Sequence, residues 1–155
     1  MTLTLLPLMP AQAEVLAALH STGFKEPWPI EAFTSLLADP IRLGALALDD
    51  GAPVGFVLLQ QTRDEAEVLT LVVAPPARRR GAGRALMQWA ISTCAAEGQR
   101  RLVLEVAESN TGARALYNEF GFAEIGQRTG YYRGSRGAET ALLLERAVVT
   151  PTVSR

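Results

Sequence analysis

Two side chains in the second half of the chain have the types that acid–base chemistry needs, and Glu105 is the first. It lies within Arg101–Ala107, an apolar stretch that predicts a strand. Because side chains alternate along a strand, Glu105 shares one face with Val103 and Ala107. A carboxylate among apolar neighbours is costly to desolvate. Glu105 is therefore a candidate general base, and a salt-bridge partner or an edge residue is an equally good interpretation of this residue alone.

Tyr117 is the second candidate. It belongs to an apolar stripe at helical spacing, formed by Ala113, Leu116, Tyr117 and Phe120. This spacing points the ring inward, where its hydroxyl needs a hydrogen-bond partner. Tyr117 is thus a candidate proton donor, although the spacing alone favours a tyrosine that only packs. Asn110 stands just before this helix, where an N-cap belongs.

The single histidine and the single cysteine do not predict a catalytic centre. His20 lies in a predicted helix without a partner residue nearby in sequence, so we expect it at the surface rather than in an active site. Cys94 lies on the apolar stripe of a later helix and is expected in the core. We expect no metal.

An arginine- and glycine-rich loop has the features of an anion site. It joins a buried strand, predicted at 67–74, to a helix that ends near Gly98, and it carries Arg78, Arg79, Arg80, Gly81, Ala82, Gly83 and Arg84. A helix N-terminus presents free N–H groups, and glycine lets a ligand approach the backbone. Each exposed cation there is unfavourable by about 0.3–1 kcal/mol. No acidic residue in this stretch offsets the arginines, so the arrangement favours a bound diphosphate over a solvated basic turn. The pattern is neither a P-loop nor a GxGxxG fingerprint.

Size and charge limit the remaining possibilities. With 155 residues and 48% hydrophobic residues, the chain predicts one domain at 1–147 and a flexible tail at 148–155. The net charge of −1 gives no electrostatic case for nucleic acid or a membrane surface. No apolar stretch is long enough to span a membrane, and no signal peptide is evident, so we expect a cytoplasmic protein.

The elements that must position these residues alternate between strands and helices. Strands are predicted at 2–8, 43–48, 54–61, 67–74, 101–107, 122–127 and 139–145, and a loop at Gly130–Tyr132. Helices are predicted after Pro10, around Phe33, after Gly83 and at 111–120. This order predicts an α/β fold: a mixed, mostly antiparallel sheet with helices on both faces, in which the two strands flanking the long helix run parallel.

The chain resembles the GNAT N-acetyltransferase superfamily, and most of all its ribosomal-protein-alanine N-acetyltransferases of the RimI type. The resemblance begins with Arg78-x-x-Gly81-x-Gly83 between a strand and a helix. It continues through Leu104–Val106, Ser109-Asn110, Ala115–Tyr117 and Gly121-Phe122, and includes Pro27-Trp28, Phe33, Asp64–Ala66 and Tyr131-Tyr132. The chain departs from the family pattern in two places. Arg78 stands where the family often has glutamine, and the loop 133–137 differs from the loop expected in RimI-type enzymes.

The resemblance implies a cleft where the two parallel strands splay apart in a V, holding acetyl-CoA. Cofactor contacts would come from Leu71, Val72 and Val73, from Arg78, Arg79, Arg80, Gly81, Ala82, Gly83 and Arg84, and from Asn110. Glu105 would act as general base and Tyr117 as general acid. Trp28, Tyr131 and Tyr132 would contact the acceptor.

The implied reaction is acetylation of a protein N-terminus, possibly that of a ribosomal protein, by a monomer or weak dimer. An α-amino group has a pKa of about 7.7–8 against about 10.4 for lysine, so a single carboxylate suits the N-terminus better. A small-molecule amine or a lysine side chain is the alternative acceptor. A non-catalytic acyl-CoA-binding module is a third possibility.

Overall fold

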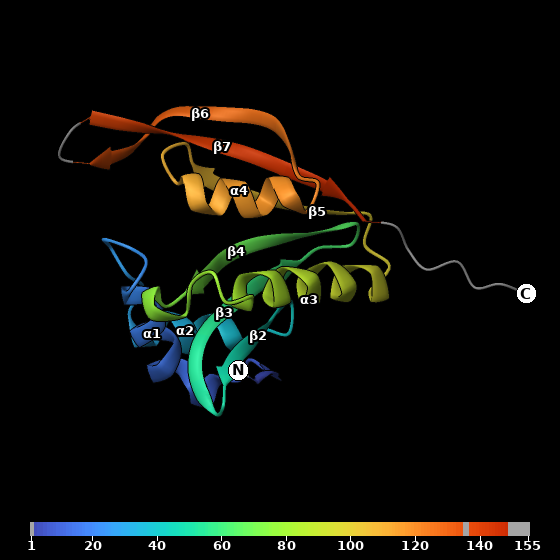
Figure 1. Ribbon diagram of the computed structural model, residues 1–155. Helices are drawn as coiled ribbons and strands as arrows, with labels where there is room; N and C mark the ends of the chain where they lie inside the picture. Colours follow the sequence, from blue (N-terminus) through green and yellow to red (C-terminus); the bar gives the residue numbers. More distant parts are fainter. Residues whose placement is uncertain (1, 135–136, 149–155) are drawn as a thin grey trace, which may run out of the picture.

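The structure is a computed structural model that describes residues 2–134 and 137–148. Its sheet has seven strands in the order β1-β2-β3-β4-β5-β7-β6 (Figure 1). The strands are β1 (Leu3–Pro7), β2 (Arg42–Asp49), β3 (Ala52–Gln61), β4 (Glu65–Val73), β5 (Arg101–Ala107), β6 (Ala123–Gly134) and β7 (Gly137–Ala147). The helices are α1 (Ala13–Ser21), α2 (Ile30–Leu37), α3 (Ala82–Ala96) and α4 (Thr111–Glu119), with 3-10 turns η1 (Pro10–Gln12) and η2 (Pro75–Ala77).

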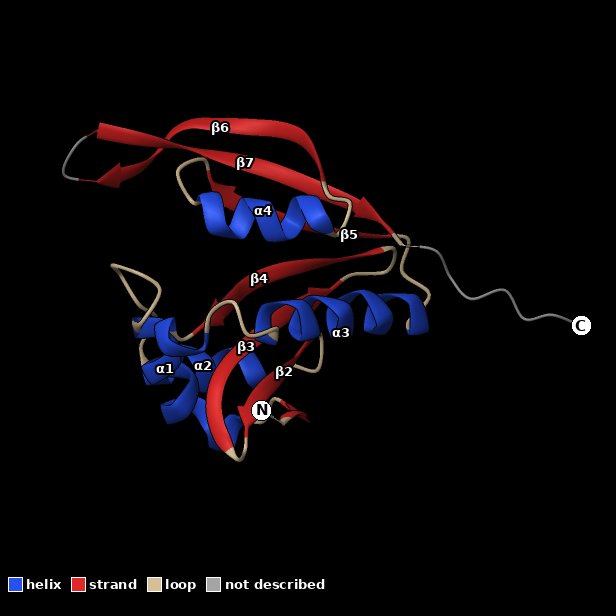
Figure 2. Cartoon of the chain, in the orientation of Figure 1, coloured by secondary structure: helices blue, strands red, loops and turns tan. Residues whose placement is uncertain are grey.

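Helices cover both faces of this sheet, as predicted. On one face, α1 and α2 bury Leu16 and Phe33 against Phe56 of β3. On the other face, α3 and α4 bury Leu86 and Tyr117 in a second cluster that also takes side chains from β2 to β5 and β7. The helices α3 and α4 lie in front of the sheet in Figure 2. The sheet is therefore the shared wall of two hydrophobic cores.

The parallel pair β4–β5 separates after a short stretch, which confirms the predicted splay. Pairing runs from Glu65 with Arg101 to Val68 with Leu104 and then stops. In Figure 1 the two strands start side by side and diverge, with α3 below the gap and α4 above it. The peptide groups of the later residues of β4 consequently face an opening instead of a neighbouring strand.

An irregularity in β4 reverses which residues face which core. Leu59 pairs with Val68, but Leu58 pairs with Thr70, so Leu69 is the extra residue of a bulge. Before the bulge, Val68 packs with the α3 core; after it, the odd-numbered residues 71 and 73 pack there, and Val72 packs beneath α1 and α2. The bulge thereby turns the end of β4 toward the opening.

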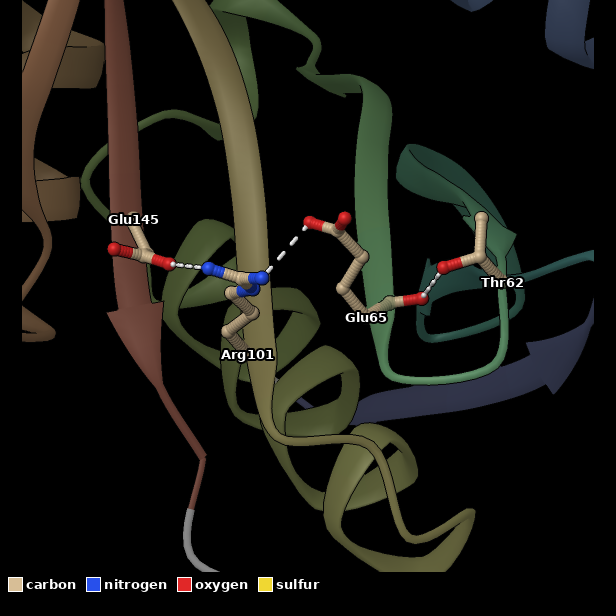
Figure 3. Close-up of polar contacts among 4 residues, drawn as sticks. All are labelled: Thr62, Glu65, Arg101 and Glu145. Carbon is tan, nitrogen blue, oxygen red and sulfur yellow. Dashed lines mark hydrogen bonds and ion pairs between the residues drawn. The ribbon is translucent and has the colours of Figure 1, made fainter.

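Arg101 ties three strands together at the closed end of the splay. Its guanidinium donates to Glu145 of β7 over 2.9 Å and lies 3.7 Å from Glu65 of β4 (Figure 3). These carboxylates raise the pKa of the guanidinium. Thr62 donates its hydroxyl hydrogen to the Glu65 carbonyl at the same corner. All these side chains are partly exposed, so their contribution to stability is small.

The structure corrects two boundaries. Tyr131 and Tyr132, predicted in a loop, belong to β6, which pairs with β7 as far as Gly134 and Gly137. Val148, predicted in the tail, is buried, and its N–H donates to the Arg100 carbonyl over 2.8 Å. The remaining predicted tail, 149–155, lies outside the described residues. No helix in the described ranges is long and apolar enough to cross a membrane.

Candidate active site

A cleft of about 1060 Å³ opens between the two halves of the sheet. Its walls come from the end of β4, the arginine–glycine loop, the start of α3 and one side of α4. The α1–α2 loop closes one corner. The lining residues are Gly23, Phe24, Leu71, Val72, Val73, Arg78, Arg79, Gly81, Gly83, Arg84, Asn110, Gly112, Ala113, Ala115, Leu116 and Glu119. The splay therefore brings together most of the predicted cofactor contacts.

The arginine–glycine loop presents backbone donors to this cleft. Gly81 forms the N-cap of α3 with a φ of 91°, and no side chain caps the N–H groups of the helix's first turn. Arg79 has a φ of 65°, which is strained for a residue with a side chain. Arg78 donates from Nε to the Val73 carbonyl over 2.9 Å, which fixes the start of the loop to β4. Together these features suit a polyanion such as a diphosphate.

Arg84 has an acidic partner that the local sequence did not show. Its guanidinium forms an ion pair with Glu119 at the end of α4, and both residues line the cleft. No acidic residue lies in the first turn of α3, as the sequence indicates, but Glu119 lies 35 residues further along the chain and offsets Arg84. Arg80 is exposed and Ala82 is buried in the core, and neither side chain lines the cleft.

The end of β4 offers peptide groups for a ligand. The Ala74 N–H donates to the Val54 carbonyl, and hydrogen-bonded pairs alternate along antiparallel strands. The register therefore turns the peptide groups of Leu71 and Val73 away from β3 and toward the gap, while those of Val72 face β3. Of the three predicted β4 contacts, Leu71 and Val73 are the ones placed for hydrogen bonding.

The opposite wall is the start of α4. The Asn110 side chain accepts a hydrogen bond from the Ala113 N–H over 3.2 Å, which confirms the predicted N-cap. Leu116 faces the start of α3, since a Cβ added to Gly83 would lie 3.4 Å from Leu116 Cδ2. The absence of a side chain at Gly83 thus keeps this part of the cleft open.

Glu105 is the first residue of β5 after the parallel pairing ends, so it stands at the apex of the splay. Its neighbours Leu104 and Val106 pack in the α3–α4 core, and alternation therefore places Glu105 on the opposite face. It is more exposed than an apolar strand predicts. Its carboxylate lies 3.8 Å from the Arg128 guanidinium of β6. Glu105 does not line this cleft, and its side chain lies on the face of the sheet opposite α3 and α4.

Tyr117 lies in the core between α3, α4 and the sheet. It is 6% exposed and packs against Phe122 with ring centroids 5.6 Å apart. Burial raises the pKa of its phenol to about 12, so the hydroxyl stays protonated at neutral pH. The ring is not part of the cleft lining, whereas its neighbour Leu116 is.

The α1–α2 loop contributes a residue that the sequence reasoning missed. Phe24 lines the cleft and is 44% exposed, which is unusual for phenylalanine. Trp28 is half-buried and stacks on His20. His20 itself is fully buried, so the prediction of a surface histidine is wrong. Four aromatic rings enclose it, and they come from positions too far apart in the sequence to be recognised as a group. The side chains of Tyr131 and Tyr132 lie outside the described part of the structure.

The fold and the cleft define an acyl-CoA-dependent transferase. A basic loop at a helix N-terminus, open peptide groups on a splayed strand and a carboxylate at the apex fit acetyl-CoA together with a second substrate. Among the described residues no group of histidine, cysteine and carboxylate side chains is arranged to hold a metal ion.

Comparison with known proteins agrees with this class. The model of the Acetyltransferase (GNAT) family matches residues 13–122. The [ribosomal protein bS18]-alanine N-acetyltransferase of Escherichia coli K12 is 34% identical over 118 residues, 76% of this chain and 79% of that protein. A putative enzyme of the same name from Bacillus subtilis is 30% identical over 127 residues, 81% of this chain and 83% of that protein.

The same similarity holds in three dimensions. The crystal structure of the ribosomal-protein-S18-alanine N-acetyltransferase from E. coli superposes with a TM-score of 0.90 at 28% identity, covering 97% of both chains. The chain therefore belongs to the GNAT acetyltransferase family and is an acetyl-CoA-dependent N-acetyltransferase similar to the RimI type.

Proposed function

We propose that this enzyme acetylates the N-terminal α-amine of a protein in the cytoplasm, with a ribosomal protein beginning with alanine as the acceptor. The names of its relatives supply the acceptor class. The observation that carries the proposal is the position of Glu105, at the apex of the splay and on the face opposite the cofactor walls. An amine that enters from this face meets a carboxylate where the gap opens.

The cofactor side of the cleft holds acetyl-CoA. The backbone N–H groups at Gly81, Gly83 and Arg84 bind the diphosphate, supported by the charge of the surrounding arginines. The peptide groups of Leu71 and Val73 bind the extended pantetheine arm of acetyl-CoA, as the peptide groups of a neighbouring strand would be bound. Asn110 borders the same arm at the start of α4. Bound there, acetyl-CoA supplies the activated acyl group as a thioester.

Glu105 removes the proton from the attacking amine. At pH 7 that removal costs about 1 kcal/mol for an α-amine and about 4.6 kcal/mol for a lysine. One carboxylate, acting directly or through a water molecule, is suited to the smaller cost. The Arg128 guanidinium at 3.8 Å keeps the carboxylate in place from one side.

The new N–C bond forms at the thioester carbonyl as the C–S bond breaks. A backbone N–H of β4 at the splay stabilises the charge that develops on the carbonyl oxygen. Tyr117 donates its proton to the departing thiolate, and a phenol with a pKa of about 12 is protonated and available as a donor at every working pH. Trp28, Tyr131 and Tyr132 complete the acceptor side in this proposal.

A panel of acceptors tests the proposal. Acetyl-CoA is offered with alanine-initiated peptides, with the same peptides carrying a blocked N-terminus and one lysine, and with small amines, and thiol release is measured. We expect release only with free peptide N-termini. Activity confined to lysine or to small amines overturns the assigned acceptor, and acetyl-CoA binding without any release overturns the assigned chemistry.

A further inference from the structure

His20 occupies an aromatic box at the end of α1. Its ring is 1% exposed and is stacked between Phe24, with centroids 4.2 Å apart, and Trp28, at 4.7 Å. Phe33 of α2 meets it edge-on at 5.6 Å, and Phe56 of β3 lies at 6.4 Å. The ring therefore contacts both ends of the α1–α2 loop and the helix that follows the loop.

The imidazole also makes one specific hydrogen bond. Its Nδ1 accepts from the Trp28 N–H over 3.1 Å, which requires an unprotonated Nδ1 and places the ring hydrogen on Nε2. Nε2 is buried and has no hydrogen-bond partner among the described residues. Burial lowers the pKa of His20 to about 4, in keeping with a neutral ring.

No charged group on the packed elements takes part in this arrangement. The rings that enclose His20 do not ionise at working pH. The ionisable residues of α1, the loop and the first turn of α2 are exposed; they are Glu14, Lys25, Glu26 and Glu31. Within the described residues β3 carries none, and the ionisable residues of β4, Glu65 and Glu67, lie at its other end.

The loop that His20 holds borders the active-site cleft. Gly23 and Phe24 are part of the lining. A Cβ added to Gly23 would lie 3.7 Å from Val72 Cγ1 and 3.9 Å from the Arg78 guanidinium, so the loop touches β4 and the start of the arginine loop. Figure 2 shows the loop projecting at the end of the gap where β4 and β5 are farthest apart. It comes from α1 and α2, which cover the sheet face toward which Glu105 points.

We propose that His20 is a positioning residue for the acceptor: its neutral ring and its bond to the Trp28 N–H hold the α1–α2 loop so that Phe24 forms one wall of the acceptor's approach. This role rests on the proposed function, because it assigns the corner of the cleft that the loop closes to the acceptor's approach, while the rest of the cleft takes acetyl-CoA.

Two substitutions separate the ring from the hydrogen bond. His20→Phe keeps the stacking and loses the acceptor atom, whereas His20→Asn loses the stacking and places an amide oxygen near the position of Nδ1. Leu58→Val is the control for a merely structural loss, because Leu58 of β3 is buried in the same cluster but is not one of the rings that enclose His20. The measured quantities are KM for the acceptor and for acetyl-CoA, and kcat, with whichever amine the panel shows to be acetylated.

We expect His20→Phe to raise the acceptor KM about tenfold, as the loss of one buried hydrogen bond predicts, while kcat and the acetyl-CoA KM change less than about twofold. His20→Asn should recover part of the acceptor KM, and Leu58→Val should leave it unchanged. An unchanged acceptor KM in His20→Phe, or an equal rise in both KM values, overturns the assignment.

Hydrogen exchange at the Trp28 amide is a readout that does not depend on the acceptor. The amide should be protected in the wild type at pH 7 and should exchange at least tenfold faster in His20→Phe. Equal exchange rates in the two proteins overturn the role of His20 even if peptides are acetylated. If the Trp28 amide exchanges faster in His20→Phe but no peptide is acetylated, the contact between His20 and the loop is supported and the proposed function is rejected.

Discussion

Replacing His20 should remove a defined part of the protein's sensitivity to acid. Burial lowers the pKa of this group from 6.5 to about 4, so the unfolded chain binds the proton more readily than the folded one. The stability that depends on its neutral form is fully present above pH 6.5 and is lost as pH falls toward 4. Linkage at 1.36 kcal/mol per pKa unit gives a loss of about 2 kcal/mol at pH 5 and about 3 kcal/mol at pH 4.

The assay is urea unfolding of the wild type and of His20→Phe, which cannot titrate at this position, at intervals from pH 7 to pH 4. Carboxylates titrate equally in both proteins, so the difference between the two free energies of unfolding isolates the histidine. We expect this difference to shift by about 3 kcal/mol in favour of the variant over that range. A difference that stays constant with pH would refute the argument that burial keeps His20 neutral.

Four substitutions test the active site. Glu105→Gln should lower the rate at least about 10²-fold, most strongly at low pH where the acceptor is protonated; an equal loss at every pH contradicts its role as base. Tyr117→Phe should slow turnover and leave the acetyl-CoA KM nearly unchanged, and wild-type turnover would remove it as the acid. Gly83→Val should block acetyl-CoA binding, because the added methyl groups meet Leu116; retained micromolar affinity would argue against the loop. Glu119→Gln should tighten acetyl-CoA binding at low salt by releasing Arg84, and unchanged affinity would show that this arginine does not face the diphosphate.

Local sequence signals predicted the elements that carry the site. The turn Asp49–Gly51 forms the expected hairpin because Asp50 and Gly51 both take positive φ, at 49° and 85°. Asn110 caps α4 because its side chain needs only the N–H three residues later. The strand, loop and helix around Gly81 could be predicted for the same reason, because their sequence pattern depends on neighbours within a few residues.

Features that depend on distant contacts were not predictable in this way. Tyr131 and Tyr132 follow a glycine and read as a loop, yet pairing with β7 extends the strand through them. His20 has no polar partner nearby in sequence, and only the folding of α2 and β3 against α1 encloses it. The partners of Arg84 and Glu105 come from α4 and β6, and no local pattern identifies them.

The early end of pairing between β4 and β5 has a consequence for how the molecule behaves as a whole. Only four residue pairs join β4 to β5 in the described sheet, so the two halves of the sheet are paired over a short length. The later residues of β4 are left to bind a ligand. A ligand that forms hydrogen bonds with Leu71 and Val73 takes the place of a neighbouring strand and lies between α3 and α4. Binding of acetyl-CoA should therefore make the protein more rigid between the two halves of the sheet, because the ligand adds contacts to both.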